Sequence, residues 1–296
     1  MTQRFKVANH LFEITLDSTA LASANIIPSL SPFVSEEEGE LLFQLRAQQG
    51  VVADFSDWEE VGQFDCGGAN HGVYRKSSGS TGFYDYGFCI SLPDFQGGNL
   101  SCCLVALEQF TRCEATLVGA PSTWQFGLNN AIMLTYAFAA ADKQTLLVHA
   151  SVIRNGGYGY LFTAPSGTGK STHTHLWYKY IPGSDLINDD NPVVRVTDGI
   201  ATVYGSPWSG KTPCYRNISA PIGAITNLKQ SPVNTIAPLP PIAAFAAMLP
   251  AVSSMKWDSY IYKGICRTIA DVISTTPIYE LNCRPDEEAA RVSYGA

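Results

Sequence analysis

The sequence predicts a mixed α/β protein in two parts: a β-rich N-terminal domain over residues 1–122 and a strand-rich α/β domain over residues 123–296. Three observations support this division. Short alternating runs broken by Gly, Ser, Asn and Pro clusters fill the first part. Residues 124–140 then carry apolar side chains at helical spacing. Beyond them, strand and helix patterns alternate around one glycine-rich turn.

The composition excludes several classes of protein. The 296 residues are 46% hydrophobic and 15% charged, which is typical of a well-buried chain and not of disorder. The formal net charge is -7, so we expect no nucleic-acid partner. No apolar run is long enough to span a bilayer and the N-terminus lacks signal-peptide features, so we expect a cytoplasmic protein with no membrane partner. The eight cysteines lack zinc-site spacing, and we expect them to be reduced and mostly buried.

The N-terminal domain is predicted to consist mainly of antiparallel strands joined by hairpins. One short helix is expected over residues 36–46, because Ser35 could cap it and acidic residues occupy its first turn. Adjacent Cys102 and Cys103 should point to opposite faces of a strand. The expected strands are 5–16, 50–55, 72–74, 83–91, 101–107 and 113–118.

The C-terminal domain is predicted to open with a buried helix and to continue with a strand hairpin. Expected helices are 124–140, 170–180, 242–248 and 260–274. Expected strands are 145–153, 158–163, 186–188, 192–196, 200–204 and 278–281.

A phosphate-binding loop is the most specific motif. A strand, a turn of small residues and a Lys-Ser pair that opens a helix form the Walker A arrangement. The helix N-terminus and the loop amides would face the phosphates, Lys170 would reach the β- and γ-phosphates, and Ser171 would hold Mg²⁺. We therefore expect ATP, or another nucleoside triphosphate, and Mg²⁺ as cofactors. The predicted nucleotide-binding residues are Ala164, Pro165, Ser166, Gly167, Thr168, Gly169, Lys170, Ser171 and Thr172.

Two carboxylates and a histidine are candidate partners of this loop. Asp189 and Asp190 follow a short apolar run, where a P-loop protein places a metal-binding carboxylate; one could bind metal while the other acts as a base. The alternative is an Asp-Asp-Asn-Pro turn without chemistry. His149 lies in an apolar strand that precedes the loop, and it is either a site residue or a satisfied core histidine.

A second glycine-bearing loop spans residues 205–211. Lys211 and Arg216 are candidates for a clamp on the transferring phosphoryl group or on its acceptor, and the alternative is a surface turn. His173 and His175 lie two residues apart on the helix after the phosphate loop, so they cannot both face a nucleotide, and we expect ordinary helix residues.

These motifs, in this order, resemble the catalytic domain of HPr kinase/phosphorylase and, more closely, its small bacterial relatives in the phosphoenolpyruvate-carboxykinase-like group. The resemblance covers about residues 125–296, and its runs are LLVHASV, GYLFTAPSGTGKSTHTHLW, LINDDNPVVRV and VYGSPWSGKTPCYRN. It implies a P-loop domain with a strand-rich core. It also implies that Lys170 and Ser171 bind phosphate and Mg²⁺, that Asp189 is the base for the acceptor, that Asp189 and Asp190 hold metal, and that His149 lies beside them.

The chain also departs from that family. Ala164 stands where HPr kinases usually carry glycine, and the loop GSPWSGK replaces the HPr kinase signature stretch, so HPr is in doubt as the substrate. The additional basic residues that hold oxaloacetate in phosphoenolpyruvate carboxykinases are not identifiable. HPr kinases form hexamers, which leaves a homo-oligomer open.

The sequence thus favours an ATP- and Mg²⁺-dependent kinase that acts on a hydroxyl of an unidentified protein or small molecule. In this reading Asp189, His149 and Lys170 are catalytic, Ser171, Asp189 and Asp190 bind metal, and Lys211 and Arg216 form the clamp. A nucleotide-binding sensor or assembly module without phosphotransfer is the alternative, and carboxykinase-like chemistry ranks third.

Overall fold

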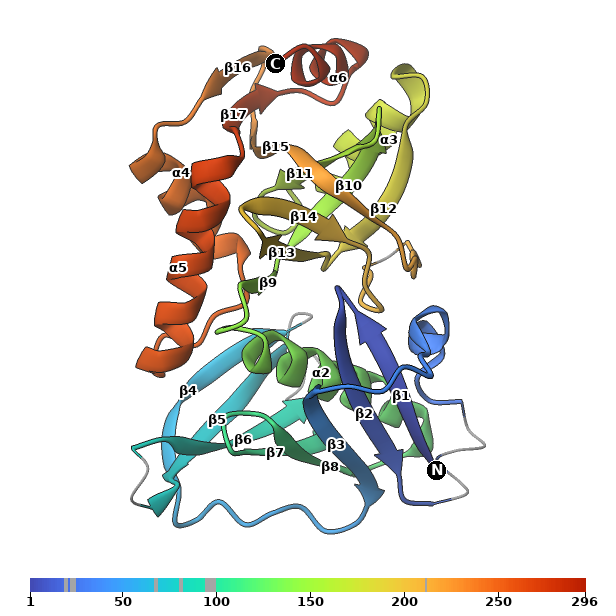
Figure 1. Ribbon diagram of the computed structural model, residues 1–296, viewed down its shortest axis with the longest axis vertical. Coiled ribbons are helices and arrows are strands. Elements are labelled where there is room, and N and C mark those ends of the chain that lie inside the picture. Colours follow the sequence, from blue (N-terminus) through green and yellow to red (C-terminus); the bar gives the residue numbers. More distant parts are fainter. Residues whose placement is uncertain (19–20, 22–24, 67–68, 80–81, 94–99, 211) are drawn as a thin grey trace. The chain divides into compact units, whose positions relative to one another are not determined.

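The chain folds into two compact units, Met1–Ala139 and Ala140–Ala296. Figure 1 shows the computed structural model, which describes all residues except 19–20, 22–24, 67–68, 80–81, 94–99 and 211. Both units are built on large sheets, so the predicted mixed α/β class is confirmed. Among the described residues, no helix has the length and apolar character needed to cross a membrane.

The N-terminal unit is one sheet with a long helix, α2 (Pro121–Ala139), packed against β3, β6, β7 and β8. Within the described residues the sheet has eight strands in the order β1-β2-β3-β8-β7-β6-β5-β4. A short 3-10 helix, η1 (Pro28–Phe33), precedes β3. The strands are β1 (Thr2–Val7), β2 (His10–Leu16), β3 (Leu41–Gln49), β4 (Glu59–Cys66), β5 (Ala69–Ser77), β6 (Tyr84–Ser91), β7 (Leu100–Leu107) and β8 (Arg112–Leu117).

Four predictions for this unit are wrong in part. The strand expected over residues 5–16 is a hairpin, because a turn at Ala8 and Asn9 separates β1 from β2. No helix forms over residues 36–46; β3 begins at Leu41, because its burial alternates along the strand and its edges pair with β2 and β8. The side chain of Ser35 does accept a hydrogen bond from the Glu37 backbone N–H, at 3.2 Å, but in a turn and not in a helix. Residues 50–55 form no strand, and β3 runs parallel to both of its neighbours in a sheet that was expected to be antiparallel.

Helix α2 belongs to the N-terminal unit. The sequence divides the domains between residues 122 and 123, whereas the compact units divide after Ala139. The helix contributes buried residues such as Leu128, Ile132 and Tyr136, and the Tyr136 hydroxyl donates to the carbonyl oxygen of Val7 at 3.1 Å. The predicted helix is therefore present, with its apolar side chains packed on the N-terminal sheet.

The C-terminal unit is built on a mixed sheet. Its described strands follow the order β12-β10-β11-β15-β14-β13-β9, and β17 joins β15 to β16. The strands are β9 (Thr145–Leu147), β10 (Ala150–Asn155), β11 (Tyr158–Thr163), β12 (Asp185–Asp190), β13 (Val193–Thr197), β14 (Ile200–Tyr204), β15 (Ser219–Gln230), β16 (Thr235–Pro238) and β17 (Ile278–Cys283). The helices are α3 (Lys170–Tyr180), α4 (Pro241–Met248), α5 (Ser259–Thr275) and α6 (Glu287–Tyr294), with a 3-10 turn, η3 (Leu249–Ala251).

Most of the predicted elements of this unit are confirmed, and three elements were not predicted: β15, β16 and α6. The strand expected over residues 145–153 is interrupted, because β9 pairs with β13 while β10 pairs with β11 and β12. His149 lies at this interruption. Helix α3 packs on β10, β11, β12 and α6 around buried Phe162 and Trp177, and this packing holds the start of α3 beside the ends of those strands.

Candidate functional site

A glycine-rich loop, residues 164–169, joins β11 to α3. Gly167 and Gly169 have φ of 79° and 118°, which side-chain-bearing residues rarely adopt. No side chain caps the start of α3, so the helix presents uncapped backbone amides and the positive end of its dipole. Pro165, Ser166 and Gly167 are exposed. The loop therefore offers N–H donors to an anion from solvent.

Lys170, the first residue of α3, is directed into the unit and is 8% exposed. Its Nζ lies 2.6 Å from Nε2 of His149 and donates to the carbonyl oxygen of Ala164 at 3.1 Å. Burial lowers the pKa of Lys170, while the carboxylates of Asp190 and Asp189 oppose this shift. The amine is thus held by the His149 ring and the Ala164 carbonyl oxygen, two contacts that a phosphate oxygen could replace.

His149 connects this lysine to the acidic pair. Its backbone N–H donates to the carbonyl oxygen of Ala251 at 2.6 Å, which fixes the residue between β9 and β10. Its Nδ1 lies 3.3 Å from Oδ1 of Asp190. Burial and the nearby Lys170 lower the pKa of His149, and Asp190 and Asp189 oppose them. A neutral imidazole between an amine and a carboxylate can accept a hydrogen bond on one side and donate on the other.

Asp189 is 5% exposed and accepts a hydrogen bond from the hydroxyl of Ser171 at 2.8 Å. The pairing of β10 with β12 sets this contact, since Asp189 lies opposite Ser151 and Asp190 lies opposite Ala150. The prediction that both carboxylates stand at a strand end beside the loop agrees with this register.

Asp190 has an unusual backbone, with φ of 131°. This region is essentially reserved for glycine and costs on the order of 1–3 kcal/mol, so the surrounding structure must impose it. Burial raises the pKa of Asp190, the neighbouring Asp189 raises it further, and His149 and Lys170 oppose both. The amide of Asn191 donates to its second carboxylate oxygen at 2.8 Å. Strain at a half-buried carboxylate is typical of a functional position.

The loop after β14 lies against the acidic pair. The backbone N–H of Gly210 and the hydroxyl of Ser209 both donate to the carbonyl oxygen of Asp189, at 2.7 and 3.0 Å. A Cβ on Gly210 would lie 3.1 Å from Cβ of Asp190. Only glycine therefore fits here without moving the carboxylate.

A buried polar latch, formed by Asn188 and Ser206 and not predicted from the sequence, holds this loop. Asn188 and Ser206 are both fully buried. The Asn188 amide donates to Oγ of Ser206 at 3.2 Å and to the carbonyl oxygen of Trp208 at 3.1 Å, while its oxygen accepts from the Asn191 backbone at 3.1 Å. Oγ of Ser206 donates to the carbonyl oxygen of Asn191 at 2.6 Å. A polar residue inside the apolar run before the acidic pair was the available signal.

Oxygen ligands for a hard cation are present in the site. Oγ of Ser171 and the carboxylate of Asp189 are a hydroxyl and an anionic oxygen, the donor types that Mg²⁺ prefers. In the described part of the chain, no three His, Cys, Asp or Glu side chains gather as a metal site. Mg²⁺ is usually held by one or two carboxylates, water and substrate phosphates.

Comparison with solved structures gave likenesses, one of which is described below. No family model and no curated protein sequence matches the chain. The structure is similar to that of the HPr(Ser) kinase/phosphatase from Coxiella burnetii, with 9% identity and a TM-score of 0.31, over 50% of this chain and 94% of that chain. A likeness at this score carries no weight for fold or function.

Of the predicted clamp residues, Lys211 lies outside the described residues, and Arg216 is not brought to the site. Its guanidinium pairs with Asp185 at 3.0 Å and also donates to the carbonyl oxygen of Leu186. Asp185 begins β12, and four residues of strand, about 13 Å, separate it from Asp189. Thr172 is exposed on the first turn of α3.

The two helix histidines lie away from this cluster of contacts. His173 is buried and contacts Oγ of Ser293 at 2.9 Å, which links α3 to α6. Burial lowers its pKa to about 4. His175 is exposed. Both positions agree with their prediction as ordinary helix residues.

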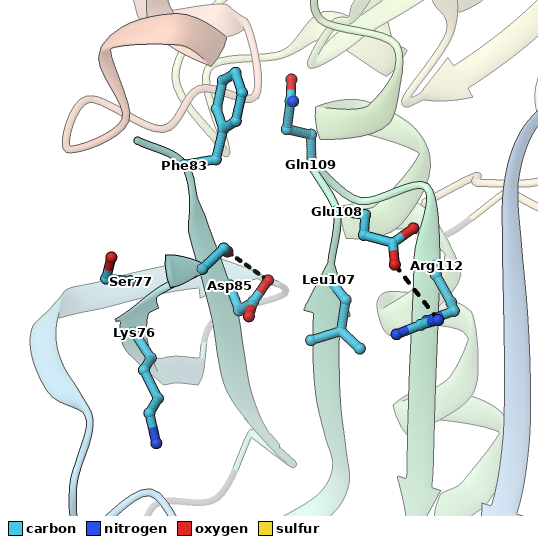
Figure 2. Close-up of a pocket in the computed structure, with 9 residues that line it drawn as sticks. Lys76, Ser77, Phe83, Asp85, Leu107, Glu108, Gln109 and Arg112 are labelled. Carbon is cyan, nitrogen blue, oxygen red and sulfur yellow. Dashed lines mark hydrogen bonds and ion pairs between the residues drawn. The ribbon is translucent and has the colours of Figure 1, made fainter. Parts of the chain in front are cut away.

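The N-terminal unit has a separate hollow of about 570 Å³ (Figure 2). Its charges are matched, because its lining holds two cations, Lys76 and Arg112, and two carboxylates, Asp85 and Glu108, of which Arg112 and Glu108 pair at 3.4 Å. With no excess charge to select a ligand, the hollow supports no assignment. Its lining residues are Lys76, Ser77, Ser78, Phe83, Asp85, Leu107, Glu108, Gln109 and Arg112.

Proposed function

We propose that residues 140–296 form an ATP- and Mg²⁺-dependent phosphotransferase that acts on a hydroxyl group. One observation carries the proposal: a single chain of contacts connects the start of α3 to both carboxylates. It runs from Asp189 to Ser171 at 2.8 Å, and from neighbouring Lys170 through His149 to Asp190 at 2.6 and 3.3 Å. A satisfied surface turn would not require a buried lysine, a half-buried histidine and a strained aspartate together.

The glycine-rich loop acts in this proposal as a P-loop. Its exposed amides and the uncapped α3 start bind the phosphates, and Lys170 exchanges its contacts with His149 and Ala164 for phosphate oxygens. Ala164 at the first position supports this use, because it is buried in the core and its backbone oxygen already holds the lysine.

Ser171 and Asp189 would hold Mg²⁺. Two neighbouring octahedral ligands at about 2.1 Å from Mg²⁺ lie about 3.0 Å from each other. The observed separation of 2.8 Å between the two oxygens fits such a pair with little movement. When bound, the ion would neutralise charge on the transferring phosphoryl group.

The geometry favours Asp190 over Asp189 as the base that accepts the hydroxyl proton. The carboxylate of Asp189 is buried and already accepts a hydrogen bond from Ser171. The carboxylate of Asp190 is more exposed, and Nδ1 of His149 orients it. Burial raises the pKa of Asp190, and a raised pKa makes a carboxylate a better proton acceptor near neutral pH. This exchanges the roles that the family resemblance implies for the two residues.

The test is phosphoryl transfer from γ-labelled ATP into a lysate of the host lacking the protein, followed by separation of labelled proteins and small molecules. We expect the Asp190→Asn variant to lose transfer by about a hundredfold or more while it retains ATP binding. Asp185→Asn is the matched control, because it removes a carboxylate from the other end of the same strand. Transfer by Asp190→Asn at the wild-type rate would refute the base assignment.

A nucleotide-binding module without transfer is the remaining alternative. It would bind ATP through the same loop and would show no label on any acceptor, with or without the acidic pair. Lys170→Ala separates the outcomes further, since we expect it to weaken ATP binding in either case. If wild-type protein and Lys170→Ala bind ATP equally, both the phosphotransferase and the module are wrong.

A further inference from the structure

Two cysteines of the N-terminal unit face each other across neighbouring strands. Cys89 on β6 lies directly opposite Cys103 on the antiparallel strand β7. Directly opposite residues have Cβ atoms about 4.5–5.5 Å apart, and a disulfide needs about 3.5–4.5 Å. The two thiols are already hydrogen-bonded to each other. A small side-chain movement would therefore bring the sulfur atoms to bonding distance.

The two thiols differ in exposure. Phe88 and Ile90 point to the core face of β6, so Cys89 between them points to the other face, where it is half-buried. On its other side Cys89 lies opposite Gly72, which has no side chain to cover it. Cys103 is 1% exposed. A small reagent can therefore reach Cys89 from solvent, whereas Cys103 is closed to it.

The hydrogen bond divides the pair chemically as well. Donation from Cys103 lowers the pKa of the Cys89 thiol, although burial opposes this shift. The same bond and burial raise the pKa of Cys103. The exposed member thus has thiolate character, which makes it the nucleophile, while the buried member keeps its proton.

We propose that Cys89 and Cys103 form a redox-active thiol pair that reduces a hydroperoxide, with Cys89 as the attacking and Cys103 as the resolving cysteine. The Cys89 thiolate attacks the terminal peroxide oxygen; an S–O bond forms, the O–O bond breaks, and the leaving hydroxide or alkoxide takes a proton from solvent. Sulfur of Cys103 then attacks sulfur of Cys89. The S–S bond forms, the S–O bond breaks, and the leaving hydroxide takes the proton of Cys103 as water.

Other described cysteines lack this combination. Cys102 is fully buried and lies opposite Ile90, and burial raises its pKa. Cys113 is buried as well, with its pKa raised to about 12 by burial. Cys283 has partial exposure similar to that of Cys89, but burial raises its pKa. Cys283 therefore serves as an internal control for exposure alone. The proposal is independent of phosphotransfer, since it concerns only the N-terminal sheet.

The test treats the native full chain with hydrogen peroxide and maps its disulfides by mass spectrometry of peptides. We expect a Cys89–Cys103 disulfide, and in Cys103→Ala a sulfenic acid on Cys89 that dimedone traps. Without peroxide, alkylation of Cys89 should be about tenfold or more faster than that of Cys283. Cys102→Ala is the matched control and should form the same disulfide as the wild type.

Three results would overturn the proposal. One is a disulfide that forms only after the chain is unfolded. The second is dimedone labelling of Cys283 as fast as that of Cys89. The third is wild-type alkylation at equal rates for these two cysteines, a measurement that needs no substitution and so stands even if Cys103→Ala does not fold.

Discussion

The buried imidazole of His173 should make the stability of the protein depend on pH in a way that one substitution removes. His173 lies against the ring of Phe162, with centroids 4.5 Å apart, and contacts Oγ of Ser293 at 2.9 Å. The indole N–H of Trp177 donates to the same oxygen at 2.8 Å. Replacing His173 with Gln keeps a polar partner for Ser293 and eliminates the titrating group.

The magnitude follows from the pKa of the histidine in the two states. Burial lowers the pKa of His173 from about 6.5 in the unfolded chain to about 4 in the folded chain. Between these values the unfolded chain binds the proton and the folded chain does not, so protonation favours unfolding as pH falls. The stabilisation is complete above pH 6.5 and is lost progressively towards pH 4. A shift of about 2.5 units corresponds to about 3 kcal/mol in total, of which about 2 kcal/mol is lost between pH 7 and pH 5.

The assay is urea denaturation of the wild type, His173→Gln and His175→Gln at pH 7 and pH 5. The exposed His175 on the same helix is the matched control, and its variant should keep the wild-type difference between the two pH values. His173→Gln should lose about 2 kcal/mol less free energy of unfolding than the wild type over this interval. An equal loss in His173→Gln and wild type would show that His173 is not the buried, neutral residue that links α3 to α6.

Three further predictions concern the candidate site. Gly210→Ala would place a Cβ 3.1 Å from Cβ of Asp190, so phosphoryl transfer should fall about tenfold or more with ATP affinity unchanged. Gly50→Ala is the control and should be neutral, because its Cβ would meet its nearest neighbour at an ordinary 3.8 Å. Normal transfer by Gly210→Ala would contradict the close contact with Asp190. Asn188→Ala should lower the free energy of unfolding in urea by about 2–4 kcal/mol, because it removes the hydrogen bonds of a fully buried amide and leaves the Asn191 backbone N–H without the Asn188 oxygen. A loss below about 1 kcal/mol would argue against the latch. Removal of Mg²⁺ with a chelator should abolish phosphoryl transfer, and excess Mg²⁺ should restore it. Transfer that persists in the presence of chelator would contradict a metal-binding role for Ser171 and Asp189.

Local sequence patterns predicted a helix or strand well where neighbouring residues along the chain determine it. The helix after the glycine-rich loop begins and ends at the predicted residues, Lys170 and Tyr180. The expected helix over residues 36–46 is wrong for an instructive reason. Ser35 and the acidic residues after it form a good capping pattern, but the apolar side chains that follow alternate with period two and pair with β2 and β8. The partners of a strand outweighed a local helix signal.

Long-range pairing decided which candidate residues meet. The order of motifs did not reveal that Arg216 pairs with Asp185, at the start of β12 and not at its acidic end. The polar Asn188 inside an apolar run was a local sign of the latch, but its partners Ser206 and Trp208 lie about twenty residues further along the chain. The Arg216 contact has no such local sign.

The sequence by itself determined that a glycine-rich turn joins a strand to a helix with Lys170 and Ser171 at its start, because backbone freedom and helix initiation are local properties. Only the tertiary structure decided the contacts of the two carboxylates. The register of β12 against β10 and the loop at Gly210 direct Asp189 towards Ser171 and hold Asp190 in a strained conformation against His149. Two adjacent, identical side chains differ there only because the surrounding strands and loop give each a different environment.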